Sequence, residues 1–144
     1  MTDTTRVLFL CTGNSARSLM AEALLRDTAS DRFEAHSAGR EPFGVRPETL
    51  EVLAEAGVSV DGLRSKGIDE YLGKVQIGIL ITVCAHAEEN CPRIWPGVGT
   101  HLHWPIEDPA LVEGEGRIEA FRRARDEITA RMQEWLAETD ALPE

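Results

Sequence analysis

Residues 11–18 read Cys-Thr-Gly-Asn-Ser-Ala-Arg-Ser, and the chain on either side of them indicates the fold to which they belong. The apolar run 6–10 (RVLFL) before them is typical of a buried strand. The segment 19–25 (LMAEALL) after them is rich in helix formers, with apolar residues at helical spacing. The stretch therefore predicts a loop between the C-terminal end of a strand and a helix, where open α/β sheets bind ligands.

The residue types in this loop suit the binding of an oxyanion. Backbone N–H groups of a tight loop, backed by a helix N-terminus, form a concave anion site. The same positive environment favours the thiolate form of Cys11, which is then a nucleophile. Arg17 offers a planar fork to two oxygens, Gly13 allows a sharp turn, and Ser18 can donate a hydrogen bond to the thiolate. The expected oxyanion-binding residues are Thr12, Gly13, Asn14, Ser15, Ala16, Arg17 and Ser18.

Two other interpretations of this loop are weaker. A nucleotide P-loop would end in Gly-Lys-Ser or Gly-Lys-Thr, and that ending is missing here. A plain buried cysteine before an ordinary helix would not need Gly13, Asn14, Arg17 and Ser18 at these positions. We therefore expect the C-x5-R-S pattern to mark a reactive site.

The rest of the chain predicts elements in the order β-α-β-α-turn-β-loop-β-α. They are the strand before residue 11, a helix at about 18–28, a strand at 33–38, a helix from Pro47 to a cap at Gly57, a helical turn at 68–72, strands at 75–83 and 102–104, and a helix at 113–138. This order indicates an α/β class, with a three-layer, four-stranded parallel sheet and helices on both faces. We see no repeat or linker, so we expect a single domain over residues 1–144.

Composition limits the function classes. The chain has 144 residues, of which 42% are hydrophobic, enough for a core. No apolar run approaches the roughly 18 residues of a membrane span, and the N-terminus lacks a secretory apolar region, so we expect a cytoplasmic protein. The net charge of −10 argues against nucleic acid or an anionic membrane as partner. The local field of the loop must outweigh this charge if the ligand is an oxyanion.

The other two cysteines, Cys84 and Cys91, form a C-x6-C pair. Cys84 ends a predicted strand at the same sheet edge as Cys11. A helix between the pair would rise about 10.5 Å over seven residues, whereas a disulfide needs Cα atoms within about 4.4–6.8 Å. A disulfide here would therefore require unwinding, which would make it a conformational switch. Two alternatives stay open: two buried core cysteines, or a zinc site made from Cys84, His86, Cys91 and either His101 or His103.

Asp108 follows the last predicted strand in the sequence Glu-Asp-Pro. At the C-terminal edge of the sheet it would face Cys11, and a carboxylic acid there could protonate a departing oxygen. The alternative is an aspartate that only shapes the turn before a proline. Beside the loop at 11–18, general acid is the interpretation we favour.

The loop resembles the signature of the low-molecular-weight tyrosine phosphatase fold, and the whole chain is most similar to the thioredoxin-coupled arsenate reductases of that fold. The matching stretches are Cys11–Ser18, Ser37-Ala-Gly39, Thr82-Val-Cys84, Glu89-Asn-Cys91-Pro92 and Glu107-Asp-Pro109.

This resemblance implies arsenate reduction through Cys11, a relay through a Cys11–Cys84 and then a Cys84–Cys91 disulfide, and regeneration by thioredoxin. Arg17 and Asp108 would assist, and no cofactor is expected. A mycothiol-linked system would use Cys11 without needing Cys84 and Cys91. Two other functions stay open: a tyrosine phosphatase on the same loop, and a non-enzymatic sensor of oxyanions or thiols. Residues 110–113 (ALVE) lack the aromatic side chains that such phosphatases usually carry after Asp-Pro, so we expect at most weak phosphatase activity.

The resemblance also implies a loop-supporting cluster. In some reductases of this family a potassium ion lies behind the loop, and Asn14, Glu22 and Ser37 match three of its ligands. The fourth, an aspartate there, is Lys66 here. An ammonium would repel the ion and could take its place, with Asn14, Glu22 and Ser37 accepting its hydrogen bonds. We therefore expect no metal and no potassium dependence; the alternative is an exposed surface lysine.

Overall fold

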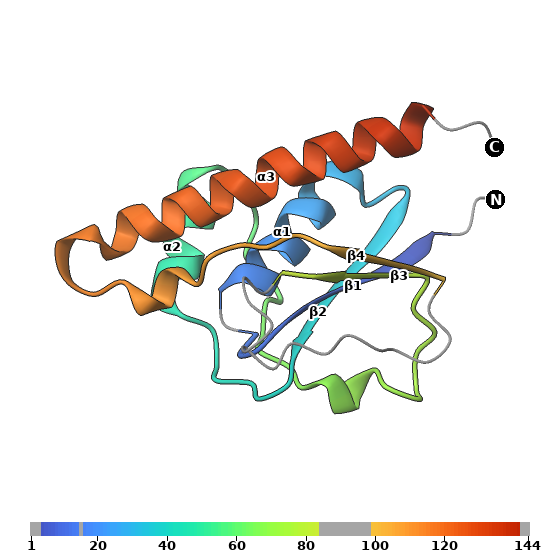
Figure 1. The fold of residues 1–144 in the computed structure, drawn as a ribbon, viewed down its shortest axis with the longest axis horizontal. Coiled ribbons are helices and arrows are strands. Elements are labelled where there is room, and N and C mark those ends of the chain that lie inside the picture. Colours follow the sequence, from blue (N-terminus) through green and yellow to red (C-terminus); the bar gives the residue numbers. More distant parts are fainter. Residues whose placement is uncertain (1–3, 15, 84–98, 142–144) are drawn as a thin grey trace.

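A computed structural model describes residues 4–14, 16–83 and 99–141. Its centre is a sheet of four parallel strands in the order β2-β1-β3-β4 (Figure 1). The strands are β1 (Thr5–Cys11), β2 (Phe33–Gly39), β3 (Ile79–Thr82) and β4 (Thr100–His103). The predicted α/β class with a four-stranded parallel sheet is confirmed. Because β1 and β3 are interior strands, their C-terminal ends meet at the middle of one sheet edge.

The described residues form three α-helices, α1 (Arg17–Ala29), α2 (Pro47–Glu55) and α3 (Arg117–Ala141), and these lie on one side of the sheet (Figure 1). Their apolar side chains share one core cluster with alternate residues of β1 and β3, such as Phe9 and Ile81. Helix α1 packs against β1, β2 and α3, and all of its first nine residues are buried. Burial on all sides explains why segment 19–25 is apolar at every position except Glu22, rather than on one stripe.

A second, smaller cluster covers the opposite face. Leu8, Leu10 and Leu80 of the sheet pack there against Tyr71 and Ile77. The 3-10 helix η1 (Ile68–Glu70) and the chain after it supply this cover. The two covering layers are therefore unequal: three α-helices on one face and, among the described residues, a 3-10 helix with extended chain on the other.

The third strand is shorter than predicted. Residues 75–78 do not belong to it, because Val75 closes a turn by donating its N–H to the carbonyl of Tyr71, 2.9 Å away. Val75 and Ile77 instead pack on the second face of the sheet. The β-rich pattern of residues 75–78 correctly indicated burial. These residues cover one face of the sheet, however, and do not pair with it as part of β3.

Helix ends also differ from the prediction. Helix α2 ends with Ala56 as its cap, and Gly57 follows in the left-handed conformation with a φ of 76°. Helix α3 begins at Arg117, four residues later than predicted, because residues 114–116 form the 3-10 helix η4 (Gly114–Gly116). Gly114 has a φ of 79°, a conformation that does not continue into an α-helix.

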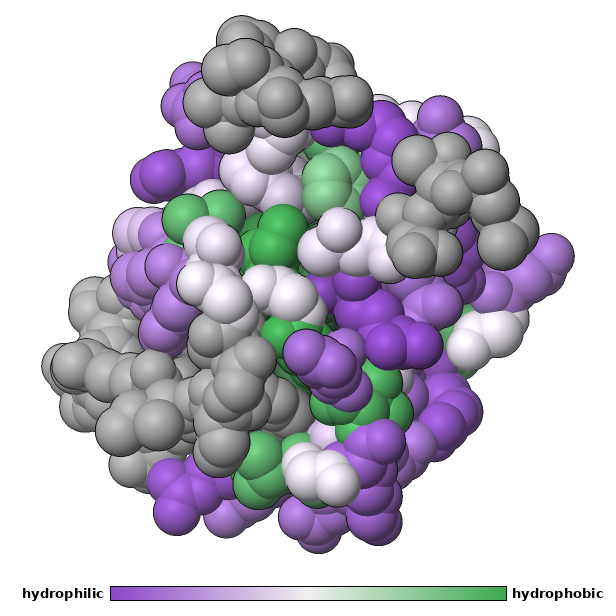
Figure 2. Space-filling view, turned by 90° about the vertical axis from the view of Figure 1, so that its right-hand side faces the viewer, coloured by the Kyte–Doolittle hydropathy of each residue, from purple (hydrophilic) through white to green (hydrophobic). Residues whose placement is uncertain are grey.

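The surface is mixed in character. On the side of the molecule that faces right in Figure 1, hydrophobic residues form small patches among hydrophilic ones (Figure 2). No helix in the described part of the chain is both long and apolar enough to cross a membrane.

Candidate active site

The C-terminal edge of the sheet brings together residues that are far apart in sequence. Cys11 is the last residue of β1, Arg17 is the first of α1, and Asp108 follows β4 through residues 104–107. Arg17 Nη2 lies 3.6 Å from Asp108 Oδ2. A thiol, a guanidinium and a carboxyl group therefore converge on the loop that the sequence analysis singled out.

The sulfur of Cys11 is buried and receives two hydrogen bonds. The backbone N–H of Asn14 donates to it over 3.2 Å, and Ser18 Oγ lies 2.9 Å from it. Ser18 Oγ accepts a hydrogen bond from the Asn14 side-chain amide at 2.7 Å, so its own hydrogen is free to point at the sulfur. Two donors on one sulfur suit a thiolate, because hydrogen bonds to a charged acceptor are the stronger ones.

Asn14 holds the loop in its curved shape. It is fully buried and has a φ of 46°, which makes it the one non-glycine residue with positive φ in the described part of the chain. Its amide nitrogen donates to Ser18 and to Ser37, and its carbonyl oxygen accepts from the backbone N–H of Lys66 at 2.6 Å. Asparagine tolerates the left-handed region better than most residues, and these hydrogen bonds stabilise that conformation.

Gly39 lies directly against the loop. A Cβ atom at this position would be 2.7 Å from Asn14 N and 2.8 Å from Thr12 O, too close for any backbone contact. Beyond it, Glu41 and Phe43 donate their N–H groups to the carbonyls of Thr12 and Gly13. The segment after β2 thus braces the loop from one side. Gly39 was named from the sequence only as part of the stretch Ser37-Ala-Gly39 that matches the family, and this role was missed; a glycine directly after two small residues was the available signal.

Arg17 is held by backbone carbonyls of the segments that follow β3 and β4. Its Nη1 donates to the carbonyl of Ile106 at 3.0 Å and to that of Val83 at 3.5 Å. The side chain is buried, so its orientation is determined by carbonyl groups of the core rather than by solvent. The helix that Arg17 opens has Ala16 at its N-cap, whose side chain cannot accept a hydrogen bond. Donor groups are therefore concentrated at this helix start, as an anion site requires.

Asp108 uses its two carboxylate oxygens differently. Oδ1 accepts the N–H of Ala110 over 3.0 Å and caps the 3-10 helix η3 (Pro109–Leu111), while Oδ2 faces Arg17. The turn interpretation and the general-acid interpretation are therefore compatible in one residue. An oxyanion in the loop would compete with Asp108 for Arg17.

The loop-supporting residues form one buried cluster behind the loop. Ser37 Oγ donates to Glu22 Oε1 over 2.6 Å, and the Lys66 ammonium lies 2.9 Å from the same oxygen. Glu22 Oε2 pairs with Arg26. Lys66 is 5% exposed, so it is not a surface lysine. Of its three expected acceptors only Glu22 contacts the ammonium; Asn14 accepts from the backbone of Lys66, and the hydroxyl of Ser37 donates to Glu22.

Several predicted site residues lie outside the described part of the chain. They are Ser15, Cys84, His86 and Cys91. The two remaining histidines of the zinc alternative flank Thr82, whose Oγ1 lies 2.7 Å from His103 Nδ1 and 3.5 Å from His101 Nε2. Within residues 4–14, 16–83 and 99–141, no group of three or more His, Cys, Asp or Glu side chains could hold a metal ion.

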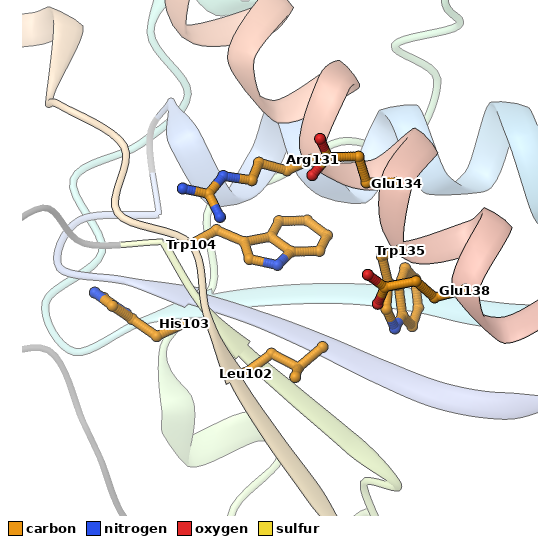
Figure 3. Close-up of a pocket in the computed structure, with 7 residues that line it drawn as sticks. All are labelled: Leu102, His103, Trp104, Arg131, Glu134, Trp135 and Glu138. Carbon is orange, nitrogen blue, oxygen red and sulfur yellow. The ribbon is translucent and has the colours of Figure 1, made fainter.

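A separate hollow of about 220 Å³ lies between β4 and α3 (Figure 3). Its lining residues are Leu102, His103, Trp104, Arg131, Glu134, Trp135 and Glu138. The two tryptophan rings meet edge to face, with centroids 6.0 Å apart. The lining includes neither Cys11 nor Arg17 nor Asp108, so we assign no part of the chemistry to it.

Comparison with known proteins agrees with this geometry. A sequence model of the low molecular weight phosphotyrosine protein phosphatase family matches residues 6–142, and the chain belongs to this family. The arsenate reductase of Halalkalibacterium halodurans is 38% identical over 129 residues, which are 88% of this chain and 91% of that protein. An arsenate reductase structure from Archaeoglobus fulgidus has a TM-score of 0.73 at 32% identity, over 91% of this chain and 98% of that one.

A third relative is a thioredoxin-dependent arsenate reductase of Corynebacterium glutamicum. Its structure has a TM-score of 0.69 at 29% identity and covers 95% of this chain, which in turn spans 62% of that longer chain. The expected resemblance to arsenate reductases with the low-molecular-weight phosphatase fold is thus confirmed.

Proposed function

We propose that this protein reduces arsenate to arsenite, with Cys11 as the nucleophile and a protein dithiol such as thioredoxin as the final reductant. One observation carries the proposal: the buried sulfur with two hydrogen-bond donors lies at the sheet edge of a chain whose relatives, matched over about nine-tenths of their length, are arsenate reductases. Arsenate is tetrahedral and anionic, as this loop requires.

The first step is attack by the Cys11 thiolate on arsenic. A sulfur–arsenic bond forms, and one arsenic–oxygen bond breaks. The departing oxygen leaves as water once Asp108 has given it a proton. Arg17 holds two of the remaining oxygens and thereby orients arsenic toward the sulfur.

The next steps transfer two electrons from thiols to arsenic. The Cys84 thiolate attacks the Cys11 sulfur, the electron pair of the sulfur–arsenic bond stays on arsenic, and arsenite leaves. A Cys11–Cys84 disulfide remains. Cys91 then attacks Cys84, which frees Cys11 and forms a Cys84–Cys91 disulfide that an external dithiol reduces by exchange. This relay rests on the family resemblance and on the C-x6-C spacing.

A weak phosphatase activity is the second candidate. Two large apolar side chains next to the site are strongly exposed: Phe43, whose N–H bonds the loop at Gly13, and Leu111 in the turn after Asp108. An aromatic ring of an aryl phosphate could pack against them. Because only one of the two is aromatic, we expect slow hydrolysis of such esters beside faster arsenate reduction.

The deciding assay follows NADPH oxidation with arsenate, thioredoxin and thioredoxin reductase. We expect turnover that depends on all components and is lost in Cys11→Ser, because a serine hydroxyl is not ionised at neutral pH. Absence of turnover with thioredoxin, but activity with a mycothiol-linked system, would reassign the reductant. Oxyanion binding without turnover under any reductant would favour the sensor interpretation.

A further inference from the structure

Lys66 is fixed at the back of the signature loop by its main chain. Its N–H donates to Asn14 Oδ1 over 2.6 Å, and its carbonyl accepts from the N–H of Gly39 at 2.8 Å. These two bonds tie the segment before η1 both to the loop and to the end of β2. The lysine side chain therefore starts from a defined position and extends into the protein, where 6% of it remains exposed.

The carboxylate of Glu22 meets this ammonium in the interior. Only 4% of the Glu22 side chain is exposed, and the two charged groups are 2.9 Å apart. Glu22 also accepts from Ser37 on the same oxygen and pairs with Arg26 through the other. A buried charge is strongly unfavourable unless it is paired and hydrogen-bonded, and here the partners are all supplied by the chain itself.

The hydroxyl of Ser37 transmits the charge of Glu22 to the loop. Its single proton goes to Glu22, so its oxygen is left to accept from the Asn14 amide at 2.9 Å. The same amide donates to Ser18, whose proton is thereby directed to the sulfur of Cys11. By accepting the Ser37 proton, Glu22 thus determines the direction of the hydrogen bonds that link it through Asn14 and Ser18 to the sulfur of Cys11.

A potassium ion, which the family resemblance implies at this place, does not fit these contacts. The Glu22 oxygens and Asn14 Oδ1 already accept hydrogen bonds, and the Lys66 ammonium carries the charge that the ion would bring. We propose that the Lys66 ammonium is a built-in cation that pairs with the Glu22 carboxylate and so positions Asn14, Ser18 and Cys11. Lys66 is a positioning residue, and the loop needs no alkali cation from solution.

The first test measures the reactivity of the Cys11 thiol toward an alkylating reagent rather than arsenate reduction, so it does not rest on the proposed function. In a chain with Cys84→Ser and Cys91→Ser, the alkylation rate of Cys11 by iodoacetamide is followed against pH. Lys66→Met keeps both backbone bonds but lacks the charge. We expect its pH profile to shift to higher pH, with alkylation at neutral pH at least 5-fold slower. Lys74→Met, at an exposed lysine, is the matched control and should leave the profile unchanged.

Lys66→Met leaves Glu22 buried without this partner and can lower the melting temperature. The double variant Glu22→Gln with Lys66→Met removes both charges and should fold with a melting temperature closer to wild type. The proposal requires that the alkylation profile of this double variant stays shifted, because the neutral amide that replaces the Glu22 carboxylate no longer orders Ser37 and Asn14. A wild-type profile in either variant would overturn the proposal.

The second test uses arsenate kinetics in potassium and in tetramethylammonium at equal ionic strength. The wild type should give the same kcat and KM within twofold in both salts. Lys66→Asp should lose at least 10-fold in kcat in tetramethylammonium and recover in potassium. A gain specific to potassium in the wild type, or no recovery of Lys66→Asp, would contradict the proposal. If the protein does not reduce arsenate, the alkylation test still decides whether Lys66 positions the loop.

Discussion

Arg17 and Asp108 form an ion pair at 3.6 Å beside the signature loop. The group that should bind the oxyanion is therefore paired with the group that should protonate it. Their side chains differ in exposure, at 4% for Arg17 and 26% for Asp108. The Arg17 guanidinium is also anchored by the carbonyls of Ile106 and Val83, whereas the Asp108 carboxylate is partly exposed and has one further hydrogen bond, from Ala110 to its other oxygen. When arsenate takes Arg17, Asp108 is therefore the partner that is released.

Asp108→Asn tests this relationship. We expect kcat to fall by roughly 10²–10⁴-fold, the usual range for a lost general acid. Oxyanion binding should be retained or tightened, because an amide competes less well for Arg17. Single-turnover rates and titration with phosphate measure the two effects separately. Asp69→Asn removes the same charge from an exposed position and should change neither. An unchanged kcat in Asp108→Asn would leave Asp108 with its turn role alone.

Cys91→Ser tests the relay. The variant should reduce arsenate for about one turnover and then stop, because no thiol remains to release the Cys11–Cys84 disulfide. Peptide mass mapping of the stalled protein should find that disulfide. Steady turnover of the variant with thioredoxin as sole reductant would show that Cys91 is not the resolving thiol.

Gly39→Ala tests the brace beside the loop. The added methyl group would lie 2.7–2.9 Å from backbone atoms of residues 12–14, which cannot move aside as a flexible side chain can. We expect a loss of about 1–3 kcal/mol in the free energy of unfolding, together with a marked fall in kcat. Gly116→Ala is the matched control, since its nearest neighbour would be Val112 Cγ1 at an ordinary 3.7 Å. Equal effects of the two variants in thermal melts and kinetics would disprove a special role for Gly39.

Arg117→Met tests a tether between α3, α2 and the turn after Asp108. Arg117 bonds Glu48 and the carbonyls of Ala110 and Val112. We expect the variant to lose about 1–2 kcal/mol in the free energy of unfolding near neutral pH. Arg123→Met, at an exposed position of the same helix, should lose little.

The pH dependence of that loss follows from Glu48. The hydrogen bond from Arg117 lowers the pKa of Glu48 below its ordinary 4.5. A lowered pKa in the folded state contributes stability above about pH 4.5, and that contribution disappears as the pH falls through the folded-state pKa. Denaturant unfolding of wild type and Arg117→Met should therefore differ most at neutral pH and less in acid. A difference that grows below pH 4 would contradict this account.

Local signals in the sequence were sufficient for the element types and for the chemical character of the site. The strand–loop–helix around residues 11–18, the apolar spacing of α3 and the pattern C-x5-R-S all depend on neighbours within a few residues. The chemistry of a thiol, a guanidinium and a carboxylic acid is a property of the residue types themselves. Such features can be predicted because they need no knowledge of which segments meet.

Only the tertiary structure decided the relationships between segments that are distant in the sequence. In the run 75–83, the sequence could not show that residues 75–78 cover the sheet and residues 79–82 form a strand. The pairing of β3 with β1 and β4 decides this. Gly39 needs its lack of a side chain only because β2 ends beside Asn14. Lys66 and Glu22 are 44 positions apart, and no local pattern places an ammonium 2.9 Å from a buried carboxylate. The physical reason is that burial and charge pairing depend on which surfaces the folded chain brings together, whereas periodicity and residue type are carried by each segment alone.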